Sequence, residues 1–245
     1  MEDKALLSTE EASGAEKAEL LIVIPAYNEA ENIERVVNHL TANFPQYDYV
    51  VVNDGSRDET AAICQRNGYN LLNLPVNLGL AGAFQAGLKY ADKYGYQYAV
   101  QLDGDGQHRP EYLESMIKKM EEGYDIVIGS RFVGEKKPFT MRMLGSNLIE
   151  MAIRFTTGVN IKDPTSGMRM FSKRMIREFA SGLNYGPEPD TVSYLIRQGA
   201  RVAEVPVIMD ERILGVSYLT PVNAMRYMLK MLSSILLIQN FRKRR

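Results

Sequence analysis

The sequence predicts an α/β fold with a doubly wound, mostly parallel sheet flanked by helices. Residues 20–24 are a fully apolar run, which is typical of a central parallel strand buried on both faces. Strand-like and helix-like segments then alternate four or five times over residues 20–131, the pattern of successive strand–helix–strand units. The chain has 245 residues and 45% hydrophobic content, enough for one sizeable core. Because it contains no internal repeat and no long linker, the second half is expected to pack on the first as one unit.

The strands of the first half are expected where short runs of β-forming or apolar residues occur. They cover residues 20–24, 47–53, 70–73, 98–102 and 125–129. Helices are expected between them where apolar residues recur at helical spacing, as at Ile33, Val36, Val37 and Leu40. The others cover residues 59–67, the Ala-rich stretch that ends at Tyr94, and the stretch opened by Pro110. Ser56 or Asp58 is expected to cap the helix at residues 59–67.

The second half is expected to add helices and two further strands. The helices cover residues 141–156, the stretch from the capping Ser172 to Ala180, residues 191–198, and a stretch from about Pro221. The strands cover residues 168–171 and 201–209, with a polar turn at 163–167 and a Gly/Pro-rich loop at 184–190. The main domain is therefore expected to span residues 19–218, with a lead-in at 1–18 and a C-terminal helix and tail at 219–245.

Composition excludes several classes of protein. The formal net charge is −1, so the chain lacks the basic field that nucleic-acid binding uses. Its single cysteine, Cys64, forms no intrachain disulfide, which fits a reducing compartment. Residues 1–18 are acidic, lack the basic and apolar regions of a secretory signal, and are expected to be a disordered lead-in. No window reaches the roughly 20 apolar residues of a membrane span, since residues 228–238 are too few and contain Lys230.

Two carboxylates and an amide follow the fourth expected strand, at Asp103, Asp105 and Gln107. Such hard oxygen ligands suit Mg²⁺ or Mn²⁺ carrying a substrate phosphate, but the same residue types also form ordinary solvated turns. The stretch half-matches an EF-hand loop with Glu114 at the twelfth position. That match fails because His108 occupies the position that needs glycine, and because a strand precedes the turn.

Several expected strands end in polar residues that suit phosphates or nucleotides. They stand at residues 25–29, 54–56 and 103–107 and at Arg131. Because parallel strands joined by helices all point the same way, these ends share one edge of the sheet. Solvation alone would scatter such turns, so their convergence favours a binding site.

The glycine-rich segment at residues 79–87 is a weak dinucleotide motif. Its spacing is not Gly-x-Gly-x-x-Gly, and it follows the third strand rather than the first. Gly79 is instead expected to let the backbone pass near a ligand, and Gly82 and Ala86 to allow close packing of a helix on the sheet. The sequence contains no P-loop and no Gly-x-Ser-x-Gly nucleophile elbow.

Six motifs occur in an order known from one family: VIPAYNEAENI, VVNDGSRDET, NLGLAGAFQAGL, QLDGDGQHRP, IGSRF and DPTSGMRMF. With them the chain resembles the family 2 glycosyltransferases of GT-A fold. Within that family it is similar to the polyprenyl-phosphate glycosyltransferases, such as dolichyl-phosphate mannose synthases. The resemblance covers roughly residues 20–235.

The resemblance implies a role for each matching residue. It assigns nucleotide binding to Pro25, Tyr27, Glu29, Asp54 and Asp103, to which Gly79 is added for its place near the ligand. A divalent Mg²⁺ or Mn²⁺ is assigned to Asp105 and Gln107, and the acceptor phosphate to Arg131, Arg142, Ser146 and Arg212. Arg142 and Ser146 share one helix face, although Arg142 could also be a solvated helix charge.

The carboxylate that acts in catalysis is less clear than the binding residues. Arg131 and Asp105 are expected to take part through the phosphates that they bind. Asp163 is the favoured further residue, either as the catalytic or sugar-orienting carboxylate or as a turn cap before Pro164. Glu188 and Asp190 are carboxylates of open role.

The sequence departs from the family in the segment DERILGVSYLTP. It keeps Arg212, Gly215 and Ser217 of the family's Arg-x-x-Gly-x-Ser-Lys element, but Tyr218 stands where a Lys is expected. A cation that could meet a phosphate is therefore missing. Either Arg212 or Arg226 compensates, or the acceptor differs.

The C-terminal segment combines apolar residues with a basic tail. Residues 226–245 contain six Lys or Arg and no Asp or Glu. An apolar stripe followed by a basic tail is typical of a helix lying on an anionic membrane; a core-packed helix with a solvated tail is the alternative. Besides its substrates, the expected partners are therefore the membrane surface, a small membrane protein or a second copy of the chain.

These observations predict a metal-dependent inverting glycosyltransferase, cytoplasmic and peripheral on the inner face of the cell membrane. It is expected to move a hexose or N-acetylhexosamine from a nucleotide sugar, in the first place a UDP-sugar, to a polyprenyl phosphate such as undecaprenyl phosphate, for cell-envelope glycan synthesis. Three alternatives stay open: transfer to a glycan hydroxyl, nucleotidyl transfer that releases pyrophosphate, and a nucleotide-sugar-binding subunit without turnover. The intact Asp103, Asp105 and Gln107 argue against the last.

Overall fold

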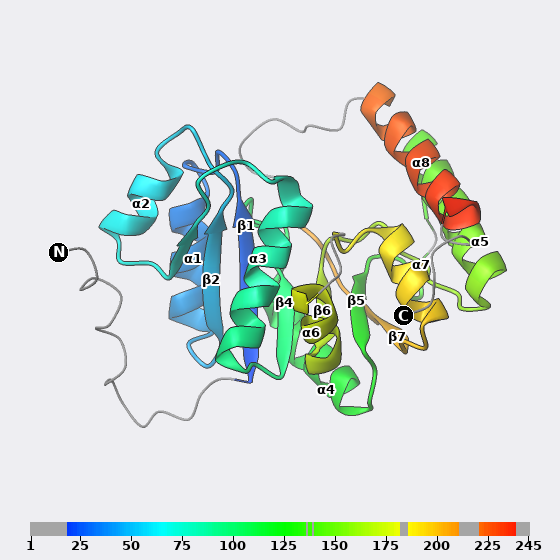
Figure 1. The fold of residues 1–245 in the computed structure, drawn as a ribbon, viewed down its shortest axis with the longest axis horizontal. Coiled ribbons are helices and arrows are strands. Elements are labelled where there is room, and N and C mark those ends of the chain that lie inside the picture. Colours follow the sequence, from blue (N-terminus) through cyan, green and yellow to red (C-terminus); the bar gives the residue numbers. More distant parts are fainter. Residues whose placement is uncertain (1–18, 136, 139, 182–185, 211–220, 239–245) are drawn as a thin grey trace.

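The fold is seen in a computed structural model of the chain. It describes residues 19–135, 137–138, 140–181, 186–210 and 221–238, apart from the side chains of residues 141–142 and 221–223 (Figure 1). The expected lead-in at residues 1–18 and the basic tail at 242–245 lie outside the described residues.

Strands and helices alternate along the described chain, as the sequence predicts. The strands are β1 (Leu20–Ala26), β2 (Asp48–Asn53), β3 (Leu71–Asn73), β4 (Tyr98–Gln101), β5 (Ile126–Ser130), β6 (Arg169–Ser172) and β7 (Val202–Pro206). The helices are α1 (Ile33–Asn43), α2 (Thr60–Arg66), α3 (Gly79–Tyr94), the short 3-10 helix η1 (Pro110–Tyr112), α4 (Leu113–Glu121), α5 (Met141–Thr157), α6 (Lys173–Ser181), α7 (Pro189–Arg197) and α8 (Pro221–Leu236).

The predicted caps can be checked against this list. The amide of Thr60 donates to Asp58 at the start of α2, and the hydroxyl of Ser172 accepts from the amide of Met175 in α6. The strand expected at 201–209 is shorter and ends at Pro206.

The seven strands form one sheet in the order β3-β2-β1-β4-β6-β5-β7, which confirms the mostly parallel α/β fold. Only β6 runs antiparallel to its neighbours: Val100 of β4 pairs with Met170, and Ile128 of β5 pairs with Arg169. Because β6 is reversed, its first residue lies at the edge where β4 and β5 end. The reversal therefore brings the turn at residues 163–167 to the same edge as the polar turns of the first half.

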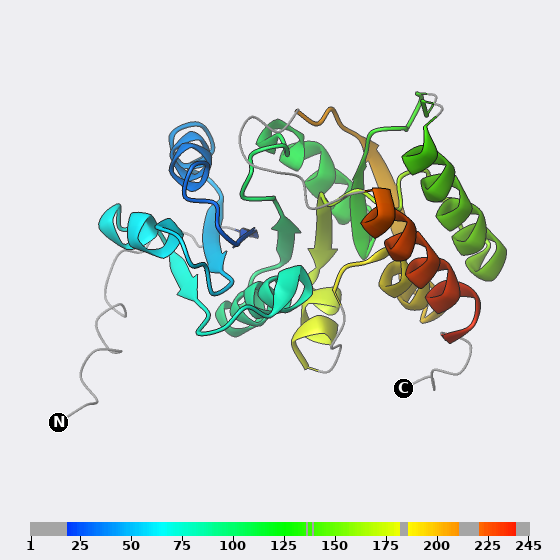
Figure 2. The ribbon, with the colours of Figure 1, turned by 90° about the horizontal axis from the view of Figure 1, so that it is seen from above.

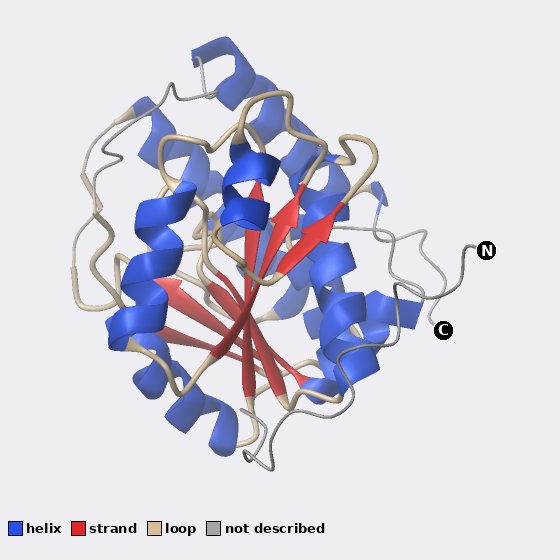
Figure 3. Cartoon of the chain, turned by 90° about the vertical axis from the view of Figure 1, so that its left-hand side faces the viewer, coloured by secondary structure: helices blue, strands red, loops and turns tan. Residues whose placement is uncertain are grey.

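Helices cover both faces of the sheet, as Figure 3 shows. Along β1, Leu20, Ile22 and Ile24 pack toward α1, α2 and α4, whereas Leu21 and Val23 pack toward the layer that contains α3 and α6. This alternation follows from the two-residue period of a strand, and it explains why β1 is apolar throughout.

The helix α3 lies close to the strand beneath it. A Cβ atom at Gly87 would lie 2.3 Å from Cγ1 of Val23, so a side chain here would force the helix away from β1. Gly87, rather than the expected Gly82, provides this close approach, since Gly82 meets only the side chain of Leu78.

The helices α5 and α8 lie side by side at one end of the molecule (Figures 1 and 2). The side chain of Met228 on α8 fits against Gly145 of α5, and Met231 and Ile235 turn into the core. The outer side of the pair carries exposed apolar residues: Leu144, Leu148, Met151 and Phe155 on α5, and Met225, Leu229 and Leu236 on α8. Within the described part of the chain, no helix combines the length and the hydropathy needed to cross a membrane.

Candidate active site

A cleft of about 260 Å³ lies where β1, β2 and β4 end. It is lined by Pro25, Ala26, Tyr27, Glu29, Asp54, Leu80, Ala83, Asp103, Gly104 and Asp105. These residues come from three strand ends and from the start of α3. Three of the predicted polar turns, those after β1, β2 and β4, thus line a single cavity, whereas Arg131 does not line it.

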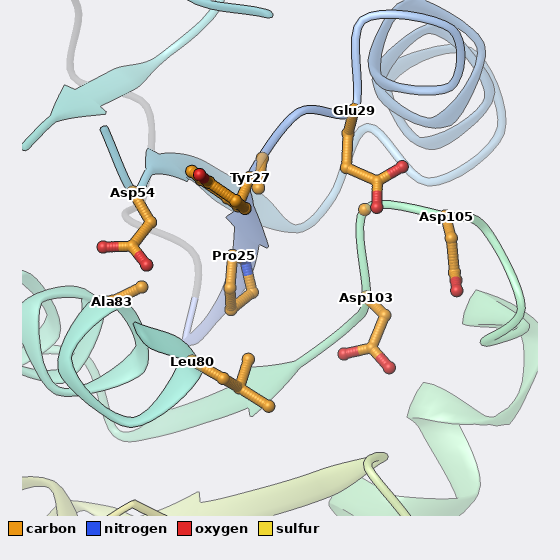
Figure 4. Close-up of a pocket in the computed structure, with 10 residues that line it drawn as sticks. Pro25, Tyr27, Glu29, Asp54, Leu80, Ala83, Asp103 and Asp105 are labelled. Carbon is orange, nitrogen blue, oxygen red and sulfur yellow. The ribbon is translucent and has the colours of Figure 1, made fainter. Parts of the chain in front are cut away.

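The carboxylates of this cleft lie in two places. In Figure 4 the carboxylate of Asp54 lies on one side of Pro25, and those of Glu29, Asp103 and Asp105 lie on the other. The apolar side chain of Leu80 faces Pro25 between them. The cleft therefore has one end with a single carboxylate and another where three carboxylates gather, separated by an apolar stretch.

The turn after β1 is tied to the turn after β2 by hydrogen bonds from backbone amides to side-chain oxygens. The amide of Asn28 donates to the hydroxyl of Ser56 at 3.0 Å, and the amide of Arg57 donates to Oδ1 of Asn28 at 2.9 Å. Asn28 has a φ of 55°, a left-handed conformation that asparagine tolerates better than most residues. The amide of Glu29 donates to Thr60 at 2.9 Å. The position of Glu29 in the cleft is therefore set by the start of α2.

Asp58 completes this connection. It accepts from the amide of Ala30 at 3.1 Å and from the amide and hydroxyl of Thr60. Burial on its own would raise the pKa of Asp58, but these hydrogen bonds outweigh it and lower the pKa. Asp58 thus stays charged and keeps the two turns together.

Asp54 is buried at the end of β2 and connects the cleft to α3. Its Oδ1 accepts from the amide of Leu78 at 2.7 Å, which satisfies a donor at the start of that helix. Gly55 has a φ of 64°, and a Cβ atom there would lie 2.7 Å from the backbone of Asn77. Gly79 opens α3 next to Leu80, which lines the cleft, but Gly79 itself does not line it.

The turn after β4 holds Asp103 through its neighbours. Oδ1 of Asp103 accepts from the side-chain amide of Gln101 at 2.9 Å, and the Asp103 amide donates to Nδ1 of His108 at 3.0 Å. Since Nδ1 accepts, Nε2 of His108 carries the proton, 3.7 Å from Oδ2 of Asp103. A Cβ atom at Gly167 would lie 3.2 Å from that Oδ2, so the turn at 163–167 packs directly against Asp103.

Asp105 and Gln107 are held by residues outside the turn. The backbone carbonyl of Asp105 accepts from the guanidinium of Arg35 on α1 at 3.0 Å. The side-chain Oδ1 of Asp105 accepts from the backbone amide of Gln107 at 3.0 Å. The side-chain amide of Gln107 donates to the backbone carbonyl of Asp210 at 3.2 Å. Because its NH₂ group is used in this way, the Oε1 atom of Gln107 remains the acceptor that can face a cation.

Asp210 is in turn fixed by Arg109. The guanidinium of Arg109 forms an ion pair with the Asp210 carboxylate, and this hydrogen-bonded pair lowers the pKa of Asp210. The segment that follows β7 and the turn after β4 are therefore joined by this ion pair.

The donor atoms at the three-carboxylate end fit a divalent cation such as Mg²⁺ or Mn²⁺. Asp103 and Asp105 offer hard carboxylate oxygens, and Gln107, whose backbone amide donates to Asp105, carries a side-chain amide oxygen. The described residues form no group of three or more His, Cys, Asp or Glu side chains with the spacing of an all-protein metal site. A partial set suits Mg²⁺, which is commonly held by one or two carboxylates together with substrate phosphates and water.

Arg131 and Asp163 form a buried ion pair beside this edge. Nε of Arg131 donates to Oδ2 of Asp163 at 2.7 Å, and Nη2 donates to Oδ1 at 2.8 Å. Asp163 is fully buried, whereas the side chain of Arg131 is 25% exposed. The carboxylate of Glu204 accepts from the amides of Lys162 and Asp163, both at 2.8 Å, and anchors this turn to β7.

The structure groups some of the predicted site residues and separates others. Pro25, Tyr27, Glu29, Asp54, Asp103 and Asp105 line one cleft. Arg131 and Asp163, predicted to bind acceptor and to take part in catalysis, contact each other, and both oxygens of Asp163 are engaged by Arg131. Ser146 is buried within α5 at 1% exposure. Arg212 and the side chain of Arg142 lie outside the described residues, so their assignment to the acceptor stays a prediction.

Sequence reasoning missed three residues that hold the turn after β4: Arg35, His108 and Asp210. His108 carried a signal, since a histidine five residues after Asp103 can close a glycine-containing turn on itself. Arg35 and Asp210 are 70 and 103 residues from the atoms that they contact, and no local pattern marks them.

Comparison with known proteins agrees with this fold. The sequence profile of the family described as "Glycosyl transferase family 2" matches residues 21–179. The polyprenol monophosphomannose synthase of Mycolicibacterium smegmatis is 32% identical over 86% of this chain and 84% of its own length. The undecaprenyl-phosphate mannosyltransferase of Micrococcus luteus is 31% identical over 81% of this chain and 86% of its own.

A solved structure shares the fold at lower identity. The glucosyl-3-phosphoglycerate synthase of Mycobacterium tuberculosis, crystallised with Mn²⁺, uridine diphosphate and phosphoglyceric acid, superposes with a TM-score of 0.68 at 19% identity. The match covers 92% of this chain and 79% of that one. On the family match and the two relatives, the chain belongs to glycosyl transferase family 2.

Proposed function

We propose that this protein transfers a glycosyl group from a nucleoside diphosphate sugar to a polyprenyl phosphate. The observation that carries the proposal is a carboxylate-lined cleft packed directly against the turn whose Asp163 holds Arg131. The two relatives support the acceptor, because their names describe transfer to polyprenol and undecaprenyl phosphate.

The donor is proposed to lie along the cleft, with its base near Asp54 and its diphosphate near Asp103 and Asp105. The separation of the carboxylates supports this orientation, since a diphosphate needs a cation that only the three-carboxylate end can hold. Asp105 and Gln107, with Asp103, would hold Mg²⁺ or Mn²⁺, which when bound supplies positive charge for the leaving diphosphate.

The acceptor phosphate is proposed to bind Arg131. A phosphate monoester is already anionic near neutral pH, so it needs positioning more than it needs a strong base. Guanidinium has five N–H donors, and Asp163 accepts from two of the nitrogens, which leaves donors for a phosphate. We therefore assign Asp163 the role of holding Arg131 in place rather than that of a general base.

The reaction is proposed to be a single displacement. An acceptor phosphate oxygen forms a bond to the anomeric carbon while the bond from that carbon to the diphosphate breaks, so the configuration inverts. The nucleoside diphosphate takes the electron pair of the broken bond. A dianionic acceptor phosphate has no proton to lose, so this reaction needs no general base.

The outer side of α5 and α8 is proposed to rest on the membrane that carries the acceptor. Leu144, Leu148, Met151 and Phe155 recur at four- and three-residue spacing, which places them on one side of α5. Exposed apolar residues along one side of a helix are typical of a membrane or partner interface. We place the protein at the inner face of the cell membrane and expect the sugar to be a hexose or N-acetylhexosamine.

A donor–acceptor panel tests the proposal. The full-length protein is incubated with UDP- and GDP-linked hexoses and UDP-linked N-acetylhexosamines, Mg²⁺ or Mn²⁺, and undecaprenyl phosphate in detergent. A labelled lipid together with a released nucleoside diphosphate is expected with one donor. Release of pyrophosphate would instead establish a nucleotidyltransferase, and transfer only to glycan hydroxyls would replace the lipid acceptor.

A further inference from the structure

A buried arginine lies behind the candidate acceptor site. Arg169, the first residue of β6, is 3% exposed. Its Nη2 donates to the backbone carbonyl of Pro164 at 2.7 Å, and its Nε has no hydrogen-bond partner among the described residues. Burying a cation is costly unless carboxylates lie close by, so the surroundings of Arg169 need an explanation.

The start of α7 provides the negative charge. Glu188, Asp163 and Asp190 all interact electrostatically with Arg169, and the influence of Glu188 is the largest. Burial lowers the pKa of Arg169, and these carboxylates act in the opposite direction. Glu188 and Asp190 stand at the N-terminal end of α7, where the helix dipole also favours negative charge.

The helix α8 holds these two carboxylates from the other side. The hydroxyl of Tyr227 donates to Oε2 of Glu188, and the hydroxyl of Ser234 donates to Oδ2 of Asp190 at 2.6 Å. Burial, followed by the nearby charge of Glu188, raises the pKa of Tyr227, so its hydroxyl remains a donor. The helix α8 therefore contacts this polar cluster directly, and α5 packs along α8.

Two hydrogen bonds and one electrostatic interaction therefore link α8 to the turn that holds Arg131. Tyr227 donates to Glu188, the charge of Glu188 acts on Arg169, and Arg169 donates to the carbonyl of Pro164. Pro164 follows Asp163, whose carboxylate fixes Arg131 through Nε and Nη2. At its other end, the same turn reaches Asp103 through Gly167.

We infer that Arg169, which lies in the field of Glu188 and donates to the carbonyl of Pro164, is a positioning residue that lets the seating of α8 set the orientation of Arg131 toward an anionic acceptor. The inference rests on the proposed function, since the acceptor phosphate is the anion that Arg131 receives. Its physical basis is that a buried ion cluster costs stability compared with apolar packing and is strongly geometry-dependent. Such a cluster fixes one arrangement of the turn at residues 163–167, where apolar side chains would allow several.

A purely stabilising role is the alternative, and a matched pair of variants separates the two. Tyr227→Phe removes a half-buried hydroxyl that donates to a carboxylate. Tyr96→Phe removes the same kind of contact, to Oδ2 of Asp48 at 2.8 Å, but at the opposite edge of the sheet. Both variants should lose similar stability. We expect Tyr227→Phe alone to raise the KM for polyprenyl phosphate about tenfold, equivalent to about 1.4 kcal/mol, with the donor KM unchanged.

Arg169 itself is tested by charge. Arg169→Lys keeps a cation among the carboxylates and should retain more acceptor affinity than Arg169→Met, which fills similar space without charge. If both variants bind acceptor equally, or if Tyr96→Phe matches Tyr227→Phe, the cluster only stabilises the fold and the inference is overturned.

A readout without turnover separates this inference from the proposed function. The Nε–H of Arg131 can be followed by ¹⁵N nuclear magnetic resonance and assigned by its loss in Arg131→Lys. Its hydrogen exchange should be slow in the parent protein and in Tyr96→Phe, and at least about tenfold faster in Tyr227→Phe. If exchange responds in this way but no polyprenyl phosphate is glycosylated, the proposed acceptor is wrong and the positioning role stands. If transfer occurs but exchange does not change, the positioning role is wrong and the proposed function stands.

Discussion

The two halves of the sheet edge treat their carboxylates differently. We call the ends of β1 to β4, where the donor is proposed to bind, the donor half. There Asp54 accepts from the backbone amide of Leu78 and Asp103 accepts from the side-chain amide of Gln101, so both are held by neutral groups. We call the end of β5, the turn at residues 163–167 and the helices α5 and α8, where the acceptor is proposed to bind, the acceptor half. There Asp163 accepts two hydrogen bonds from the guanidinium of Arg131. Neutral partners fix a carboxylate without cancelling its charge, whereas an arginine fixes the carboxylate and also cancels its charge.

On the proposed function, this difference indicates how the negative charge of each substrate is balanced when the substrate binds. On the proposed function, a diphosphate would enter the carboxylate-lined cleft together with a cation, and the donor half would share that metal ion with it. In the acceptor half, Asp163 leaves some N–H donors of Arg131 unused, and an anionic acceptor is proposed to bind to these directly. Removing single groups from each half tests this contrast.

The largest effect is expected at the metal end of the donor half. Asp105→Ala should lower kcat at least about a hundredfold, because the leaving diphosphate loses its counter-charge. The measurement is turnover across a Mg²⁺ and Mn²⁺ titration after chelator treatment. Glu114→Ala is the control, since Glu114 is exposed on α4 and pairs with Lys118 instead. Full activity of Asp105→Ala in metal-free buffer would remove the metal site from the proposal.

A smaller and more selective effect is expected in the acceptor half. Arg131→Ala should raise the KM for polyprenyl phosphate roughly ten- to a hundredfold while donor affinity, measured by calorimetry, stays within about twofold. Arg174→Ala is the control because Arg174 also binds a carboxylate through two nitrogens, that of Asp125, at the opposite edge of the sheet. Loss of nucleotide affinity in Arg131→Ala, with acceptor kinetics unchanged, would contradict the assignment.

The apolar surface of the acceptor half should account for a further, several-fold effect. Phe155 is 86% exposed, and Phe155→Glu should weaken binding to anionic vesicles about tenfold, because burying such a ring is worth about 1.5–3 kcal/mol. Val76→Glu is the control: Val76 is 57% exposed but lies in the donor half. Vesicle co-sedimentation should also weaken at high salt, which screens basic residues. Equal losses in the two variants would mean that membrane contact is not made by α5 and α8.

Most of the donor half could be predicted from the sequence. Its strands are apolar runs that end in polar turns, and parallel strands bring such ends together, so the positions of Glu29, Asp54 and Asp103 follow from topology. What joins these turns could not be predicted. The contact of Arg35 with Asp105 depends on how α1 lies on the sheet, and nothing in the local sequence indicates it.

The acceptor half was less predictable because its contacts link distant segments. Arg131 and Asp163 were each singled out from motifs, but their pairing follows from the reversed strand β6, which brings residues 163–167 beside the end of β5. Glu188 and Asp190 had no assigned role until α7 and α8 placed them against Arg169 and Tyr227. Hydrophobic periodicity in the sequence locates helices, but it does not indicate which helices pack together.

The smallest expected effects concern two carboxylates that do not line the cleft: Asp58, beside the turns after β1 and β2, and Asp125, at the opposite edge of the sheet. For both Asp58 and Asp125, burial alone would raise the pKa. Hydrogen bonds from Thr60 outweigh burial for Asp58, and those from Arg174 and the Arg201 amide outweigh it for Asp125, so both pKa values are lowered. A lowered folded-state pKa gives a stabilisation that is present above the unfolded pKa of about 3.9 and is lost as pH falls through the folded pKa. Asp58→Asn and Asp125→Asn should each destabilise the protein by about 0.5 kcal/mol at pH 7 after solvent screening, and by less below pH of about 4.

Salt should then separate the two carboxylates. Asp125 is held by Arg174, whose side chain is 54% exposed, so the loss in Asp125→Asn should shrink in roughly 1 M salt. The loss in Asp58→Asn should not, because its partners are neutral amide and hydroxyl groups. Urea unfolding of the parent and both variants between pH 3 and pH 7, at low and high salt, measures these differences. If salt reduces both losses equally, the contrast between neutral and cationic partners does not hold away from the cleft, and the division of the sheet edge into two electrostatic halves is confined to the site itself.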